Sequence, residues 1–440
     1  MEDFDALLER AFRAAVHAAD PDRCLPPHLP PPPRGRLIVV GAGKAAASMA
    51  RVVERHYHDL PEDRFEGIVV TRYGHAAPTQ RISVLEAAHP VPDEAGVRAS
   101  ERIVALVRSA TADDVVLVLV SGGGSALLTA PDGVTAAEKA ALTQELLASG
   151  ADIHAINLVR RHLSRVKGGA LAVAAHPAPV ITLAISDVVG DAPAVIASGP
   201  TVAGAGSFQD ALDVLDRFAI EAPAARRALQ EGRAGKRRGP PAPGDPRLAG
   251  ARFVIVADAQ TSLEAAAAAI HEGGVAAYVL ASEVTGEARE VGGVHAAVAR
   301  QVARYGQPFA PPCAILTGGE TTVTVRGEGR GGRNAEFALG VASGLTGPAA
   351  DGVPERARFW VLGADTDGID GSEDNAGALL GPRQLGELAP EAVRAALARN
   401  DTYGLLQRVG GLFMTGPTRT NVNDLRIVLV AFEGARPERR

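Results

Sequence analysis

The sequence has few of the features that mark secreted, nucleic-acid-binding or membrane proteins. Its two cysteines, Cys24 and Cys313, lack CxxC or metal-ligand spacing, so we expect neither a disulfide scaffold nor a structural zinc site, and a cytoplasmic location fits. The net charge of −6 gives no basic surface for nucleic acid or for an anionic membrane. No apolar run approaches the roughly 20 residues that span a bilayer. We therefore expect no nucleic-acid or membrane partner, while the oligomeric state stays open.

Lysine is also rare. Only four of the 45 lysine and arginine residues are lysines, namely Lys44, Lys139, Lys167 and Lys236. Lys44 and Lys167 both adjoin glycines. A compact, rotatable ammonium group is not equivalent to a planar guanidinium group, so a chain that otherwise uses arginine keeps lysine where its chemistry matters. These two lysines are therefore candidates for function.

The length and the apolar pattern predict two α/β domains. Single hydrophobic cores stop growing near ~250–300 residues, and this chain has 440. Apolar runs at 37–40, 67–70, 115–120 and 180–186 alternate with alanine-rich helical stretches, which predicts a Rossmann-like parallel sheet with helices on both faces. The basic Pro/Gly-rich stretch 233–246 suggests domains 1–240 and 241–440. The second is expected to be a smaller α/β domain with a mixed sheet, on which the N-terminal helix is free to pack.

The first glycine turn, Gly41–Lys44, joins a strand to a helix. A helix N-terminus of this kind favours anions. The dinucleotide fingerprint needs a third glycine, replaced here by Ala46, and an acid after the second strand, where Thr71 and Arg72 stand instead. The missing acid argues against NAD, although Arg72 could accept the 2′-phosphate of NADP. The phosphate-loop pattern GxxxxGK[ST] is absent too, and a plain strand-to-helix turn remains an alternative.

Three further stretches of the first half carry groups suited to phosphate chemistry. The run "SGGGS" directly follows an apolar strand, and its backbone could form an anion-binding nest or only a flexible connection. Arg165 and Lys167 end a basic helix that could equally be a solvated face. Asp187 and Asp191 follow another strand, where they could hold Mg²⁺, take a proton from a hydroxyl group, or simply form a turn.

In the second half, glycines again stand beside charged groups. The motif "TGGET" carries Gly318, Gly319 and Glu320 at a strand end, and "GGRNAE" presents Arg333 and Asn334 where a helix is expected to start. An arginine fork can hold a carboxylate or phosphate with two hydrogen bonds. The acidic stretch 363–378 lacks the last glutamate of a calcium loop. Glycine loops, a few cations and several acids at strand ends are the groups that phosphoryl transfer needs.

The ordered motifs of this chain resemble those of the glycerate 2-kinase family, some of whose members are named hydroxypyruvate reductases. The motifs are "VGAGKAAASMA", "AAHPVPDEAG", "LVSGGGSALL", "HLSRVKGG", "ISDVVGDAPAVIASGPT", "TGGETTVTV", "GGRNAE", "DTDGIDG" and "TGPTRTNV". The resemblance implies ATP- and Mg²⁺-dependent phosphorylation of D-glycerate to 2-phosphoglycerate, in a cleft between two α/β domains, the second called the MOFRL domain. Lys44 and Arg333 are the active-site candidates that it implies. Arg419 departs from the pattern, which has glycine there.

Residues and resemblance together give one set of expected roles. The catalytic residues are Lys44, Asp187 and Arg333; the phosphate-binding residues are Ser121, Gly122, Gly123, Gly124, Ser125, Gly318 and Gly319; the substrate-binding residues are Arg165, Lys167 and Asn334; the Mg²⁺ ligands are Asp187, Asp191 and Glu320. The alternatives are an NADPH-dependent hydroxypyruvate reductase and a non-enzymatic anion or nucleotide sensor. The residues do not decide which acid is the base.

Overall fold

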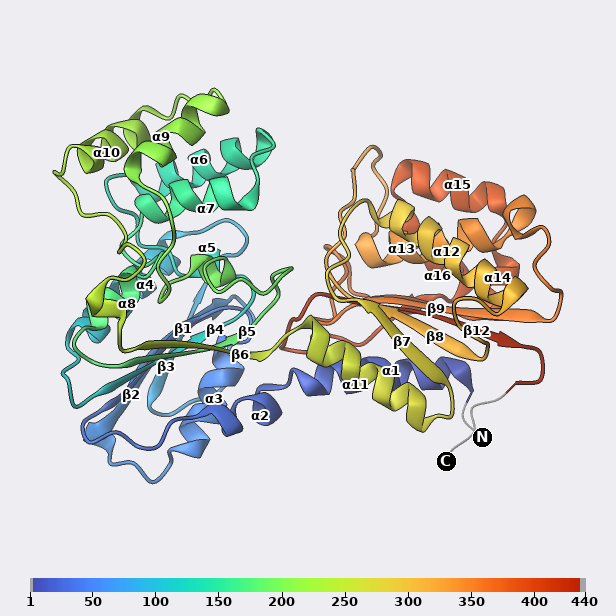
Figure 1. Ribbon diagram of the computed structural model, residues 1–440, viewed down its shortest axis with the longest axis horizontal. Coiled ribbons are helices and arrows are strands. Elements are labelled where there is room, and N and C mark those ends of the chain that lie inside the picture. The colour runs from blue at the N-terminus through green and yellow to red at the C-terminus, as the bar shows by residue number, and fades with distance from the viewer. Residues whose placement is uncertain (1–2, 436–440) are drawn as a thin grey trace. The chain divides into compact units, whose positions relative to one another are not determined.

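The computed structural model describes residues 3–435, and the chain divides into two compact units (Figure 1). The parallel-sheet unit is Pro21–Val256, and the mixed-sheet unit is Met1–Asp20 with Ala257–Arg440. The division lies beyond the expected boundary at 240/241, because strand β6 (Ala251–Ala257) is the edge strand of the first sheet. A Pro/Gly-rich stretch indicates a loop, but it does not indicate which sheet the following strand joins.

The parallel-sheet unit has a six-stranded sheet in the order β3-β2-β1-β4-β5-β6. The first five strands are β1 (Leu37–Ala42), β2 (Phe65–Arg72), β3 (Ile82–Ala87), β4 (Val115–Val120) and β5 (Val180–Ile185). β1 pairs in parallel with both β2 and β4, as do β2 with β3 and β4 with β5. This is the strand order of the Rossmann fold, and the Rossmann-like α/β class expected from the apolar runs is confirmed.

Helices cover both faces of this sheet, as Figure 1 shows. α3 (Ala46–His56) lies on one face, and α4 (Glu94–Arg108) and α8 (Ala170–Ala175) lie on the other. Two short elements, α2 (Pro21–Cys24) and α5 (Gly124–Leu127), belong to the same unit. A further helical layer consists of α6 (Ala136–Ala148), α7 (Ile153–His162), α9 (Phe208–Arg217) and α10 (Pro223–Arg233). These four helices share an apolar core of their own, separate from the core against the sheet.

The mixed-sheet unit has strands in the order β11-β10-β9-β12-β8-β7. They are β7 (Ala276–Ala281), β8 (Cys313–Thr317), β9 (Ala357–Asp365), β10 (Gly377–Leu380), β11 (Leu412–Phe413) and β12 (Asp424–Phe432). β7 and β8 are parallel, whereas β12 is antiparallel to both β8 and β9. β10 is antiparallel to β9 and β11. The mixed sheet expected for the second part of the chain is therefore confirmed.

Helices also cover both faces of the mixed sheet (Figure 1). The N-terminal helix α1 (Phe4–Ala18) packs with α11 (Ala259–Glu272) on one face, where Phe4 and Phe12 meet Trp360 and Phe413 edge to face. The other face carries α12 (Ala288–Tyr305), α13 (Arg333–Leu345), α14 (Pro382–Glu387), α15 (Pro390–Arg399) and α16 (Thr402–Val409). Within residues 3–435, no helix is both long enough and apolar enough to cross a membrane.

Candidate active site

Two loops at the carboxyl edge of the parallel sheet are hydrogen-bonded to each other. The backbone N–H of Lys44, after β1, donates to the carbonyl oxygen of Gly122, after β4, at 2.8 Å. The next N–H, of Ala45, donates to the hydroxyl oxygen of Ser121 at 3.0 Å. β1 and β4 are adjacent parallel strands, so their carboxyl ends meet at the edge where open α/β sheets bind ligands. The predicted Lys44 turn and the predicted glycine loop therefore lie side by side.

Gly43 allows this close approach. Its φ of +143° is in a region that side chains disfavour, and a Cβ atom at this position would lie 2.2 Å from the Ser121 hydroxyl oxygen. Any larger residue would push the two loops apart. The glycine before Lys44 thus has a packing reason that is independent of any cofactor.

The second serine of the glycine loop belongs to a polar network. The hydroxyl groups of Ser125 and Ser198 are 2.8 Å apart, and Ser198 donates in turn to the side-chain oxygen of Asn157 at 3.1 Å. The backbone oxygen of Ser125 accepts hydrogen bonds from Lys167, at 2.8 Å, and from Arg160, at 3.2 Å. The loop is therefore held by two basic side chains, Lys167 and Arg160, the second of which was not among the expected site residues.

The two predicted substrate-binding cations Arg165 and Lys167 lie in different surroundings. Lys167 is buried beneath the glycine loop. Arg165 pairs with Glu101 of α4 at 3.0 Å and donates to the carbonyl oxygen of Pro131. Of the two, only Lys167 is thus joined to the loop by a hydrogen bond. The expected basic helix ends earlier, at His162, so both residues lie in the turn before α8 and not on one helix face.

Asp187 and Asp191 follow β5, whose carboxyl end belongs to the same sheet edge. Both side chains are partly exposed. No group of three or more His, Cys, Asp or Glu side chains within residues 3–435 is arranged to hold a metal ion. Mg²⁺ in phosphotransferases commonly takes only one or two carboxylates together with substrate phosphates and water. Two accessible carboxylates at the sheet edge that also carries the glycine loop therefore fit a Mg²⁺ site completed by its substrate.

In the mixed-sheet unit, Arg333 is the first residue of α13 and lies among three carboxylates. Its Nε donates to Asp424 at 2.9 Å, its Nη1 to Glu320 at 2.7 Å and its Nη2 to Asp365 at 2.7 Å. Burial disfavours the charged form of Arg333, but the charges of Asp424, Asp365 and Glu320 outweigh this and raise its pKa. Glu320, a predicted Mg²⁺ ligand, is thus an ion-pair partner of Arg333.

The strand register explains why the carboxylates converge. Asp424 begins β12 and lies directly opposite Asp365, which ends β9. Like charges in opposed positions repel, and the Arg333 guanidinium group bridges them. The fully buried Arg426 side chain adds a second cation, which pairs with Asp424 and donates to the Gly318 carbonyl oxygen at 3.0 Å. The sequence analysis missed Asp424 and Arg426, although two charged residues in the apolar run "DLRIVLVAF" are a readable signal.

Asn334 and Asp370 complete the start of α13. The side-chain nitrogen of Asn334 donates to Asp424 at 2.7 Å, and its backbone N–H donates to Asp370 at 3.0 Å. Asp370 also accepts the N–H of Ala335 at 2.8 Å, so it caps two free N–H groups of the helix. Burial raises the pKa of Asp370 to about 7, although these two N–H groups act in the opposite direction.

Gly318 and Gly319 are buried where β8 ends. The carbonyl oxygen of Gly318 accepts the N–H of Val284 at 3.1 Å, and the carbonyl oxygen of Gly319 accepts the N–H of Asp424 at 3.2 Å. Both glycines thus connect three segments of the mixed-sheet unit. Their predicted contact with phosphate stays a prediction.

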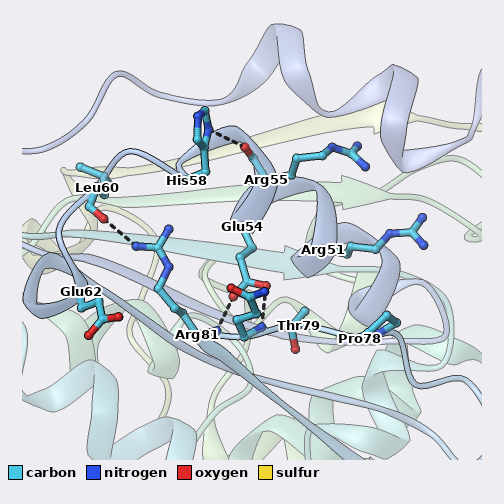
Figure 2. A pocket seen from close by; sticks show the side chains of 10 residues that line it. Arg51, Glu54, Arg55, His58, Leu60, Glu62, Pro78, Thr79 and Arg81 are labelled. Carbon is cyan, nitrogen blue, oxygen red and sulfur yellow. Dashed lines mark hydrogen bonds between the residues drawn. The ribbon is translucent and has the colours of Figure 1, made fainter.

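Figure 2 shows a polar cavity of the parallel-sheet unit, of about 560 Å³, next to α3 and the segment before β3. Its arginines have structural partners. Arg81 donates to the carbonyl oxygens of Leu60 and Tyr57, and Arg51 and Arg55 pair with Asp22. The segment that enters β3 lies at the amino edge of the parallel sheet. This cavity is therefore at the opposite edge from Lys44.

Comparisons with known proteins agree with this arrangement. A family model described as a domain of unknown function, DUF4147, matches residues 7–230, and the MOFRL family model matches residues 313–424. A protein of Agrobacterium vitis provisionally named hydroxypyruvate reductase is 47% identical over 430 residues, which cover 96% of this chain and 94% of that protein. The D-glycerate 2-kinase of Thermotoga maritima is 38% identical and covers 98% of this chain and 99% of its own length.

A solved structure shows the same fold. The crystal structure of glycerate kinase from Thermotoga maritima superposes with a TM-score of 0.85 at 36% identity, over 97% of this chain and 99% of that one. Similarity of this extent covers both units. The chain therefore belongs to the glycerate 2-kinase family of phosphotransferase enzymes.

Proposed function

We propose that this enzyme transfers the γ-phosphoryl group of ATP to the 2-hydroxyl group of D-glycerate, giving 2-phosphoglycerate and ADP, with Mg²⁺ as cofactor. The observation that carries the proposal is the direct hydrogen-bond connection between the Lys44 turn and the glycine loop Ser121–Ser125 at the carboxyl edge of a Rossmann-type sheet. A rare lysine beside an anion-binding loop suits a transferring phosphoryl group. The similarity to a D-glycerate 2-kinase over nearly the whole chain supports the choice of acceptor.

The roles follow from the chemistry of phosphoryl transfer, which asks mainly for positioning and for neutralisation of charge. Backbone groups of Ser121–Ser125 hold the phosphates, and the Lys44 ammonium group neutralises charge on the phosphoryl group as it moves. The glycerate hydroxyl oxygen forms the new bond to phosphorus while the bond to the β-phosphate oxygen breaks. The hydroxyl proton passes to a carboxylate after β5, Asp187 or Asp191.

Asp187 and Asp191 are also the residues that would hold Mg²⁺, which supplies positive charge to the nucleotide phosphates when bound. The two roles separate by substitution. A proton acceptor replaced with asparagine lowers kcat and leaves the Mg²⁺ requirement unchanged, whereas a ligand replaced in the same way raises the Mg²⁺ concentration needed for half-maximal rate.

Arg333 and Asn334 contribute from the mixed-sheet unit. Three of the five N–H groups of Arg333 donate to Glu320, Asp365 and Asp424. Two N–H groups therefore remain for a ligand, counted over the described residues. We assign these two to an anionic group of substrate, the glycerate carboxylate or the phosphoryl group. The three carboxylates hold the guanidinium plane in one orientation, so the arginine is positioned before substrate arrives.

The test is direct. Purified protein is incubated with D-glycerate, ATP and Mg²⁺, and phosphorus NMR identifies the product. Lys44→Ala should abolish turnover, whereas Lys236→Ala, which removes an exposed lysine of the same unit, should leave it unchanged. Near-normal turnover of Lys44→Ala would refute the central assignment. Steady NADPH oxidation with hydroxypyruvate, without ADP formation from glycerate, would establish the reductase instead.

A further inference from the structure

A small cavity beside the glycine loop contains three cations and no acid. It has a volume of about 170 Å³ and is lined by Lys139 of α6, Arg160 of α7, Lys167 and Ser125. The remaining lining residues include no aspartate or glutamate. Part of the wall is apolar, formed by Pro90–Pro92 and Leu147. A charged, partly apolar cavity suits a ligand that combines an anionic group with a short carbon chain.

The three cations have only neutral partners within residues 3–435. Lys139 Nζ donates to the carbonyl oxygen of Leu163 at 2.6 Å, and Lys167 Nζ and Arg160 Nη2 share the carbonyl oxygen of Ser125. None of the three forms an ion pair with a carboxylate of the described chain. Lys139 is 6% exposed and Lys167 is 1% exposed. Buried charges are normally paired, so this cluster lacks its counter-charge.

The lowered pKa values of the two lysines also indicate that the cluster lacks a negative charge. Burial lowers the pKa of Lys139 to about 7, with Arg160 acting in the same direction and Asp132 against it. Asp132 forms an ion pair with Arg237 at 2.5 Å, so its negative charge is already largely balanced by that arginine. Burial, Arg160 and Lys139 together lower the pKa of Lys167 well below its ordinary value. An anion in the cavity would reverse these effects and restore the protons.

We propose that Lys139, Arg160 and Lys167 form a binding site for a small organic anion, a carboxylate or phosphate monoester of about three or four carbon atoms. The volume supports this class of ligand, because a space of about 170 Å³ is comparable to engineered cavities that hold one small organic molecule. Two sources share this chemistry: the acceptor acid of the reaction, and a separate anionic effector. The site stands on its own residues and does not depend on the proposed kinase reaction.

The experiment is calorimetric titration of the full chain at pH 7 with D-glycerate and, separately, with inorganic phosphate. Each titration is run in two buffers of different ionisation enthalpy, so that the number of protons taken up is measured. We expect binding accompanied by proton uptake, because the anion restores the charge of Lys139. Lys139→Met should weaken binding at least ten-fold, and Lys236→Met should not.

A conservative variant separates charge from packing. Lys139→Arg keeps the positive charge but does not titrate near neutral pH, so it should bind the anion with reduced proton uptake. This pattern cannot come from misfolding, which would remove binding altogether. Binding of both probes that is insensitive to Lys139→Met, or the absence of any binding, would overturn the proposal.

The same variants identify the source of the anion. A rise in the KM for D-glycerate that matches the loss of affinity in Lys139→Met makes the acceptor acid the ligand. An unchanged KM with lost phosphate binding makes it a separate effector. A chain that binds glycerate at this site but forms no phosphorylated product would refute the kinase and leave the site standing.

Discussion

Replacing Lys139 with methionine should stabilise the enzyme at pH 6 and slightly destabilise it at pH 10. A methionine side chain fills nearly the same volume and carries no charge. The carbonyl oxygen of Leu163 loses the ammonium donor but keeps the backbone N–H of Asp132 at 3.1 Å, so no buried acceptor is left without a partner. The substitution therefore removes mainly the cost of burying a positive charge beside Arg160.

The magnitude follows from the pKa of Lys139, which lies at about 7 instead of 10.5. Each unit of pKa corresponds to about 1.36 kcal/mol, so the charged form costs roughly 5 kcal/mol in the folded state. Between pH 7 and 10.5 the unfolded chain binds a proton that the folded chain lacks, so the stability of the natural protein rises with pH across this range. Allowing about 1–2 kcal/mol for the lost hydrogen bond leaves a gain of about 3 kcal/mol at pH 6.

Urea unfolding at pH 6, 8 and 10 measures this directly, with Lys236→Met as the exposed control. The difference in unfolding free energy between Lys139→Met and the natural protein should fall as the pH rises and then change sign. The control should show no such trend. Equal destabilisation of Lys139→Met at all three pH values would contradict the reasoning, because packing and not charge would then dominate.

Other positions give independent tests. Gly43→Ala should lower the free energy of unfolding, measured by thermal unfolding, by about 2 kcal/mol or more and also lower turnover, because the new Cβ atom would collide with Ser121. The control is Gly74→Ala, which is also at positive φ but has open space around it, so it should cost about 1 kcal/mol. Arg333→Lys should lower kcat at least ten-fold, because an ammonium group cannot bind three carboxylates in one plane; a fully active variant would refute the positioning role. Asp370 has a raised pKa of about 7, so the folded state holds an extra proton between about pH 4 and 7 and loses stability as the pH rises; Asp370→Asn should flatten this dependence in urea unfolding.

The sequence predicted the parallel sheet well because its signals are local. Apolar runs at 37–40, 115–120 and 180–186 became β1, β4 and β5, and their buried residues identify them without knowledge of distant contacts. β6 was assigned to the second domain because a linker-like stretch precedes it. Strand pairing depends on tertiary contacts, and the pattern of 251–257 is that of any half-buried strand.

The lysine cluster could not be predicted, because nothing in the spacing brings its members together. Lys139 lies in α6 and Lys167, 28 residues later, lies in the turn between α7 and α8. Both meet Arg160 of α7 only in the folded chain. The scarcity of lysine identified Lys167 but not Lys139, which has no adjacent glycine. Arg160 looked like part of a solvated basic face, and the structure buries its charge next to the glycine loop.

The surroundings of Arg333 show which part of its electrostatics the sequence could not predict. The motif "GGRN" indicated a helix start that presents an arginine fork, but Asp365 and Asp424 are separated by 58 residues of chain and meet only when β9 pairs with β12. Two opposed carboxylates at the end of β9 and β12 would repel each other without the guanidinium group between them. The arginine thus stabilises the sheet edge and is oriented by it. Arg426, fully buried and paired with Asp424, adds a second positive charge at this edge, so the two arginines together balance the opposed carboxylates.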